Sequence, residues 1–204
     1  RLGNDDIRPE VTTEVEFGGE FKFFDSRLSL DVTYYEKETE DQVIPVDQSP
    51  TTGFTERVIN AGTISNKGWE IVGGLAPIRT NDFNWNIDVN FTTFENTVEE
   101  LAPNVENILL SGFNSTSSRV IAGESFGAIF GSKYQRDDNG NILIGDDGWA
   151  LVDSEDGIIG DPIPDWTMGI RNTFTYKDFS VTALLDIRQG GDIWCGTCGI
   201  IDYF

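Results

Sequence analysis

The sequence of 204 residues predicts an all-β protein built from long antiparallel strands. Two observations carry this prediction: several stretches alternate strictly between apolar and polar side chains, and each is about 12–15 residues long. Successive side chains of an extended strand leave on opposite faces, so each stretch has one apolar and one polar wall. A third observation, the alternation of short and long polar connections, indicates that the strands form consecutive hairpins.

Taken in order, three hairpins are expected, near residues 11–44, 66–94 and 165–194. In the first, Val15, Phe17 and Phe21 share one wall of the leading strand, and Leu28, Leu30 and Val32 continue it on the returning strand. Short polar turns close the hairpins; they are predicted at 25–27, 79–82 and 177–178. The long connections are predicted as loops, with some strand at their edges, at 36–57 and 95–164.

The clearest strand lies in the second hairpin, over residues 83–91. Its apolar wall opens on two large aromatic side chains, and its opposite wall is amide and carboxylate throughout. The apolar positions are Phe83, Trp85, Ile87, Val89 and Phe91, and the polar ones are Asn84, Asn86, Asp88 and Asn90. Such a strand separates an apolar from an aqueous environment. The apolar environment is either a protein core or a lipid bilayer.

Three asymmetries favour the bilayer. Strands of soluble proteins usually have about 5–6 residues, whereas tilted membrane strands need about 9–11. Short turns at one end and long loops at the other are typical of outer-membrane barrels. Aromatic residues also gather at the short-turn end of every hairpin, at Phe21, Phe23, Phe24, Phe83, Trp85, Phe174, Tyr176 and Phe179. We therefore predict a segment of an antiparallel transmembrane β-barrel, with a soluble β-sandwich or solenoid as the alternative.

Composition argues against several classes of function. The net charge of −21, with only 14 Lys and Arg residues, is unsuited to binding nucleic acid, which requires basic side chains. Histidine is absent, which removes the commonest general base and metal ligand, and no carboxylate pair is singled out by its context. We therefore expect no enzyme activity, no catalytic residue and no cofactor. No apolar run reaches the ~20 residues of a membrane-spanning helix.

The long stretch 95–164 holds 13 acidic residues and three basic ones, and it is predicted to be a solvated outer loop with local strands near 119–134 and 141–144. Within it, Asp137, Asn139 and Asn141 alternate like the start of a calcium loop. Gly140 stands at the fourth place rather than the sixth, and no Glu stands at the twelfth. A polar hairpin tip is the favoured interpretation, and a calcium site in the outer loops is the alternative.

Two features near the end of the chain leave alternatives open. Cys195 and Cys198 form a C-x-x-C that follows a strand and a Gly-Gly pair, without the βαβ context of a redox enzyme. A local disulfide or two small residues near a strand end are both compatible with this pattern. Asp186, Arg188 and Asp192 are expected to form ion pairs across strands on the polar wall.

Nearly the whole chain also resembles one known family. The matching stretches are IRPEVTTEVEFGGEFKFFDSRLSLDVTYYEKETEDQVIPV, VINAGTISNKGWEI, NDFNWNIDVNF, GESFGAIFGSKYQRDDNGNILI, VDSEDGIIGDPIPDWTMGIRNTFTYKDFSV and LLDIRQGGDIW. Their order and spacing are similar to the C-terminal barrel part of the SusC/RagA-like TonB-dependent transporters of Bacteroidetes outer membranes. Cys195 departs from the polar residue that this family usually has there.

The resemblance implies a barrel of about 22 strands with an N-terminal plug, of which residues 1–204 would supply about six strands. It implies import of oligosaccharides or peptides across the cell outer membrane, driven through TonB and assisted by a SusD-like surface lipoprotein. The opening RLGNDDIRPE suggests a fragment, so the plug, the TonB-contacting segment and the final strands are expected elsewhere. The alternative is a soluble, secreted β-rich binding or adhesion module. No ligand-binding residue can be assigned from the sequence.

Overall fold

The computed structural model describes residues 4–47, 49–113 and 115–201, and it is almost entirely β-structure. The strands are β1 (Val11–Phe23), β2 (Leu28–Glu40), β3 (Val43–Asp47), β4 (Glu56–Asn60), β5 (Gly62–Arg79), β6 (Phe83–Leu101), β7 (Asn107–Gly112), β8 (Thr116–Ile121), β9 (Ala128–Gly131), β10 (Gly157–Gly160), β11 (Pro164–Tyr176) and β12 (Phe179–Gly190). A 3-10 turn at Pro50–Thr52 and a short helix α1 (Gly196–Ile201) complete the elements. No helix among the described residues has the length and hydropathy needed to cross a membrane.

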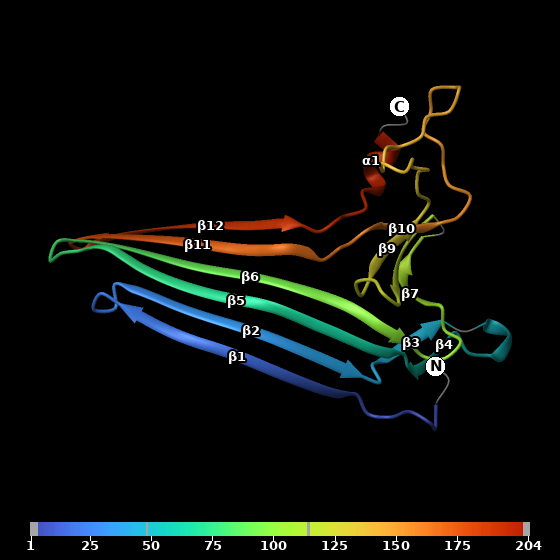
Figure 1. Cartoon of the computed structure of the whole chain (residues 1–204), viewed down its shortest axis with the longest axis horizontal. Coiled ribbons are helices and arrows are strands. Elements are labelled where there is room, and N and C mark those ends of the chain that lie inside the picture. The colour runs from blue at the N-terminus through green and yellow to red at the C-terminus, as the bar shows by residue number, and fades with distance from the viewer. Residues whose placement is uncertain (1–3, 48, 114, 202–204) are drawn as a thin grey trace.

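Six long strands form one antiparallel sheet in the order β1-β2-β5-β6-β11-β12. Figure 1 shows these strands running side by side, with three tight connections at one end and the shorter strands gathered at the other. The connections fall where the sequence predicts them, after Phe23, Arg79 and Tyr176. The three predicted hairpins are therefore confirmed, and the sheet joins them in chain order.

The strand register brings the apolar walls of all three hairpins onto one face of the sheet. In the middle of the sheet, partners run in an unbroken row through Phe21, Leu30, Gly73, Val89, Ile170 and Leu185. Neighbouring rows repeat the pattern, for example through Val32, Ile71, Phe91, Met168 and Ile187. We call this surface the apolar face. Figure 1 shows no second layer covering the length of the sheet, so these side chains are not the inside of a two-layer core among the described residues.

Aromatic side chains border the apolar face at two heights. At the short-turn end, Trp85 stacks on Phe174, with ring centroids 5.5 Å apart, beside the paired Tyr176 and Phe179. Eight residues further along β6, Thr93 is the register partner of Trp69, whose ring lies 5.0 Å from that of Tyr34. At a rise of about 3.3 Å per residue the two levels are about 26 Å apart along the strands. The sequence pattern predicts only the first of these belts.

One polar residue interrupts the apolar face and is satisfied there. Asn172 lies opposite Ile87 and Ala183 in the register. Its side-chain oxygen accepts a hydrogen bond of 3.1 Å from the indole N–H of Trp85. Both polar groups are thereby paired within the belt, so neither is left unsatisfied in an apolar environment.

The long connections, which were predicted as loops with some local strand, contain more strand than expected and fold onto one another. The sheet strands continue beyond the predicted hairpins, because β2 extends to Glu40, β5 begins at Gly62 and β6 extends to Leu101. Beyond them, β3 pairs with β4, and a second sheet has the order β10-β9-β8-β7. We call residues 41–60 and 102–163 the cap. The strand expected near 119–134 is present as the end of β8 and the whole of β9, while 141–144 forms only isolated bridges.

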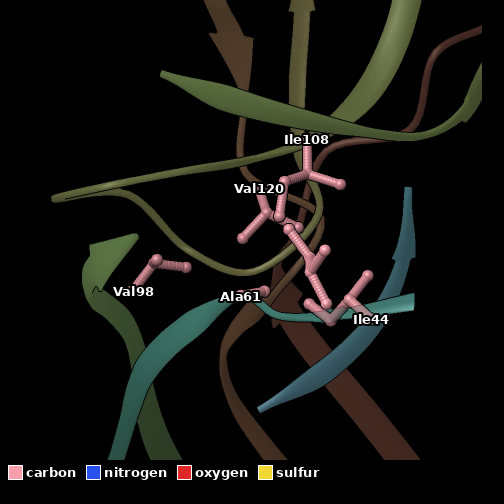
Figure 2. Packing of buried hydrophobic residues seen from close by; sticks show 6 residues of the cluster. Ile44, Ala61, Val98, Ile108 and Val120 are labelled. Carbon is pink, nitrogen blue, oxygen red and sulfur yellow. The ribbon is translucent and has the colours of Figure 1, made fainter. Parts of the chain in front are cut away.

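The cap has its own hydrophobic core. The sequence did not indicate this core, because the long connections are rich in charged residues. Figure 2 shows Ile44, Ala61, Val98, Ile108 and Val120 converging from five strands or strand ends. Val98 and Val120 are fully buried, and Val105 and Phe126 pack against the cluster. A backbone hydrogen bond also joins β6 to the cap, because the Val98 N–H donates to the Glu124 carbonyl at 2.9 Å. The cap is therefore anchored to the far ends of β5 and β6.

Gly68 is predicted to be intolerant of any side chain. A Cβ at this position would meet the backbone carbonyl of Thr93 and lie 2.9 Å from the Tyr35 hydroxyl. We expect Gly68→Ala to lower the free energy of unfolding of the full-length protein by about 1–3 kcal/mol, the usual cost of overpacking. Gly73→Ala, on the same strand, is the control, because its Cβ would meet only the Ser29 carbonyl at 4.0 Å. Equal effects of the two substitutions in urea titrations would contradict the prediction.

Candidate functional site

The face of the sheet opposite the apolar face carries the polar walls of all six strands. Register partners there include Thr33 with Glu70, Glu70 with Thr92 and Thr92 with Thr167. We call this surface the polar face, formed by Glu20, Lys22, Ser29, Asp31, Thr33, Glu70, Gly74, Asn84, Asn86, Asp88, Asn90, Thr92, Thr167, Arg171, Thr173, Thr175, Ser180, Thr182, Asp186 and Arg188. Val72 and Leu184 are its main apolar exceptions. Hydroxyl, amide and carboxylate groups in this density can exchange hydrogen bonds with a polar solute or with water.

A hollow of about 430 Å³ lies on this face near the short turns. Three arginines from three hairpins line it, namely Arg27, Arg79 and Arg171, together with Asp88. Arg171 contacts the Asp88 carboxylate through Nε and Nη2, each at 3.1 Å. Both partners are about half exposed, so this ion pair contributes little to stability. The excess of cations makes the hollow suited to anionic groups rather than to metal ions.

Charge is distributed unevenly between the two ends of the sheet. The short-turn end, taken as residues 20–31, 75–88 and 171–184, contains five basic and six acidic residues. The remaining residues, which include the cap, contain nine basic and 29 acidic ones. Nearly all of the net charge of −21 therefore lies away from the short turns. A field of this sign at the cap end disfavours the approach of polyanions.

The ion pairs expected around Arg188 are not formed among the described residues. Arg188 instead donates from Nη2 to the Pro162 carbonyl, at 3.1 Å. Asp192 accepts a hydrogen bond of 2.9 Å from the Asp161 backbone N–H. Both side chains therefore fasten the segment before β11 to the end of β12. The expectation failed because the alternation places residues on a face but does not show that a connecting segment passes within reach.

The disulfide alternative at the end of the chain is the one that the structure shows. Cys195 and Cys198 are bonded, with an S–S distance of 2.00 Å, at the start of α1. The preceding Trp194 packs on Phe113 from the β7–β8 connection, with ring centroids 5.5 Å apart. This contact joins the segment after β12 to the cap.

The residues considered for calcium form a hydrogen-bonded hairpin tip. Asp137 accepts backbone N–H groups of Asn139 and Asn141 through Oδ1, at 2.9 and 2.8 Å, and the Asn141 amide through Oδ2, at 3.0 Å. Its carboxylate oxygens are thus already engaged by the turn. The described residues contain no group of three or more His, Cys, Asp or Glu side chains placed to hold a metal ion. The calcium site stays an untested alternative.

The same hydrogen bonds give the hairpin tip a pH dependence. Donation from Asn141, first from its side chain and then from its backbone, lowers the pKa of Asp137 below its ordinary value. A carboxyl group with a lowered pKa stabilises the folded tip above its unfolded value of about 3.9, and this contribution is lost as the pH falls through the lowered pKa. We expect pepsin cleavage at Leu143, directly after the tip, to increase steeply below about pH 3.9. An Asp137→Asn variant with the same pH profile would contradict this prediction.

Comparison with known proteins identifies the family. Residues 1–191 match the family model described as TonB dependent receptor-like, beta-barrel. This chain belongs to that family. Three similar relatives are TonB-dependent receptors P3 and P26 of Formosa agariphila and TonB-dependent receptor SusC of Bacteroides thetaiotaomicron. They are 28%, 25% and 25% identical to this chain over 94%, 95% and 86% of its length. The chain spans about a fifth of these relatives, 22%, 22% and 19% of their lengths.

Solved structures agree on the fold. The RagAB peptide transporter matches 87% of this chain and 21% of its own, with a TM-score of 0.70. The RagAB peptide importer in its closed-closed state covers 89% of this chain with a TM-score of 0.71. Sequence identity is 20% in both, so this similarity concerns the fold alone. The predicted resemblance and the predicted all-β barrel fold are confirmed, although the six strands described here form an open sheet and not a closed barrel.

Proposed function

We propose that this chain forms part of the wall and outer mouth of an outer-membrane transporter that imports oligosaccharides or peptides. The observation that carries the proposal is that the sheet has two unlike faces. An apolar face bordered by two aromatic belts lies opposite a face that is polar apart from a few residues such as Val72 and Leu184. A spacing of about 26 Å between the belts suits the apolar band of about 25 Å of such barrels. The apolar face would contact lipid, and the polar face would line an aqueous interior.

The two ends of the sheet support one orientation. Outer-membrane barrels have short periplasmic turns and longer extracellular loops. The turns after Phe23, Arg79 and Tyr176 would therefore face the periplasm, and the cap would lie outside the cell. Among the described residues β1 and β12 are each paired on one side only, which suits a sheet continued by further strands of the same barrel. Residues 1–204 would then be the C-terminal part of that barrel.

The partners are proposed from the family and from the cap. Membership of the TonB-dependent receptor family supports energising by TonB through a part of the protein outside this chain. A SusD-like surface lipoprotein would cover the cap, which presents apolar side chains such as Tyr134, Ile144 and Trp149 to solvent. Exposed apolar side chains gathered on one element often mark a protein-binding surface. This part of the chain would guide solutes by binding alone, without making or breaking bonds.

Deletion of the full-length gene in the producing organism tests the proposal. We expect the deletion to abolish uptake of one class of oligosaccharide or peptide, and the restored gene to return it. The full-length protein should fractionate with the outer membrane, require detergent, and migrate differently on a gel before and after boiling. External protease should cut in the cap and spare the short turns. Unchanged uptake of every oligosaccharide and peptide tested would reject the transport function, and a freely soluble full-length protein would favour the secreted binding module.

A further inference from the structure

A second hollow, of about 700 Å³, lies within the cap. It is bounded by the segment between β9 and the hairpin tip and by one strand of the cap sheet, β10. Its lining residues are Ser132, Lys133, Tyr134, Arg136, Asp153, Ile158 and Ile159. The hollow lies at the opposite end of the molecule from the one between Arg27 and Arg171, so the two are separate sites.

This hollow contains basic side chains, although the stretch of sequence around it is strongly acidic. The stretch 95–164 has only three basic residues among 13 acidic ones, and two of the three, Lys133 and Arg136, line the hollow. Lys133 Nζ forms an ion pair with Asp153 Oδ2, at 3.6 Å, which is longer than a hydrogen bond and leaves the N–H groups of Lys133 able to donate to a ligand. Asp153 also lines the hollow, so the net positive charge there comes from Arg136. Arg136 uses Nη1 for the Gly140 carbonyl, at 2.6 Å. Its other N–H groups and the Tyr134 hydroxyl have no hydrogen-bond partner among the described residues.

Hydrogen bonds hold the backbone that carries Tyr134 and Arg136. Three short segments exchange hydrogen bonds in a closed ring: Gln135 N–H to Leu151, Leu151 N–H to Leu143, and Leu143 N–H to Gln135, at 2.8, 2.9 and 2.9 Å. The ring fixes the residues on either side of Gln135, which are Tyr134 and Arg136. The Lys133 side chain lies over Gly157, where its Cδ is 3.0 Å from the place that a Cβ on this glycine would take. A backbone that is already fixed loses less conformational entropy when its side chains bind a ligand.

The opposite wall of the hollow is apolar. Ile158 and Ile159 of β10 line it, and Ile159 is partly exposed. A ligand that fits must present an acceptor of hydrogen bonds from cations and an apolar group directly beside it. Guanidinium and ammonium groups bind planar carboxylates strongly, and Arg can do so through two parallel N–H groups. The acidic surroundings disfavour a ligand that carries many negative charges.

We propose that this hollow is a binding subsite for a single carboxylate attached to an apolar or weakly polar body. Lys133 and Arg136 would bind the carboxylate, the Tyr134 hydroxyl would donate a further hydrogen bond, and the two isoleucines would pack on the adjoining group. The proposal rests on the proposed import function and narrows its substrates to those with a carboxylate. The free C-terminus of a peptide ending in Leu or Phe has this chemistry, and so does one hexuronic acid at the end of a glycan.

The test uses the full-length protein and matched probe pairs that differ only in the carboxylate. One pair is a labelled hexapeptide ending in Leu, as the free acid and as the C-terminal amide. The other pair is a neutral trisaccharide and the same trisaccharide with one terminal uronic acid. We expect at least one acid to bind about tenfold or more tightly than its neutral counterpart, because hydrogen bonds to a charged group are stronger than those to a neutral group. Which pair discriminates identifies the source of the carboxylate.

Substitutions test whether the preference for the acid probe arises in this hollow. The double substitution Lys133→Gln with Arg136→Gln should reduce the preference for the acid to about onefold. An unchanged heat-dependent gel shift shows that this variant is folded. Arg57→Gln is the control, because it removes a cation from the cap outside the hollow and should keep the preference. A preference that persists in the double variant, equal binding of acid and neutral probe, or no binding of either acid by the unaltered protein would overturn the subsite. Loss of uptake on gene deletion tests the transporter independently.

Discussion

Replacing Val89 by arginine is expected to lower the free energy of unfolding of the full-length barrel by about 2–4 kcal/mol, the cost of a cation at the middle of a bilayer. Val89 lies between Gly73 and Ile170 on the apolar face, four residues from each aromatic level of β6. An arginine there cannot reach water by extending along the strand, since both belts are about 13 Å away. Urea titrations of the protein folded into lipid vesicles measure this effect.

Thr92→Arg is the matched control for Val89→Arg. Thr92 lies three residues further along the same strand on the polar face, between Glu70 and Thr167. An arginine there would stand in water beside a carboxylate, so its effect should stay within about 0.5 kcal/mol. Equal losses from the two substitutions would show that the two faces do not differ as lipid and water do. The membrane assignment of the sheet would then be wrong.

Truncating Ile108 to alanine is expected to loosen the cap while the sheet stays folded. Ile108 is 3% exposed at the centre of the cap core. Loss of a buried aliphatic side chain usually costs about 2–5 kcal/mol. The cap is joined to the sheet mainly at the outer ends of β5 and β6, so this cost should appear as local opening. We expect external protease to cut within residues 102–163 at much lower concentrations, with the heat-dependent gel shift of the barrel unchanged.

Leu109→Ala controls for a general weakening of β7. Leu109 is the next residue on the same strand but is 43% exposed, so its truncation removes much less buried surface. Protease sensitivity should then resemble that of the unaltered protein. Equal sensitivity of the two variants would contradict the existence of a packed cap core. A simultaneous loss of the gel shift in Ile108→Ala would show that the cap and the sheet unfold as one unit.

The strands and their two faces could be predicted because each depends only on neighbours in the sequence. Side chains two residues apart share a face of any strand, so the series from Phe83 to Phe91 determines its own apolar wall. The short turn at Lys177 and Asp178 is likewise a local signal between two alternating runs. The sequence also shows that Asn172 is a polar residue at an apolar position of its strand. Its hydrogen-bond partner, Trp85 on β6, could not be recognised from the sequence.

The cap and the candidate sites could not be predicted in the same way. Ile44, Val98 and Val120 lie in stretches with weak alternation, and they form a core only because three distant segments meet beyond the sheet. In the sequence, Lys133 and Arg136 are two of the three basic residues in the acidic stretch 95–164, and nothing there shows that they share a site. Their shared hollow depends on the hydrogen-bonded ring around Gln135 and on the position of β10. The signal that could have pointed to them is their rarity in an otherwise acidic stretch.

By itself, the sequence determined that this chain forms long antiparallel strands with one apolar and one polar side. This is because successive side chains of a strand point to opposite faces, so the pattern depends only on neighbouring residues. Tertiary structure alone decided the continuous register across six strands, the second aromatic belt and the folding of the acidic connections into a cap. These features depend on contacts between residues tens of positions apart, and such contacts arise only when the whole sheet is assembled.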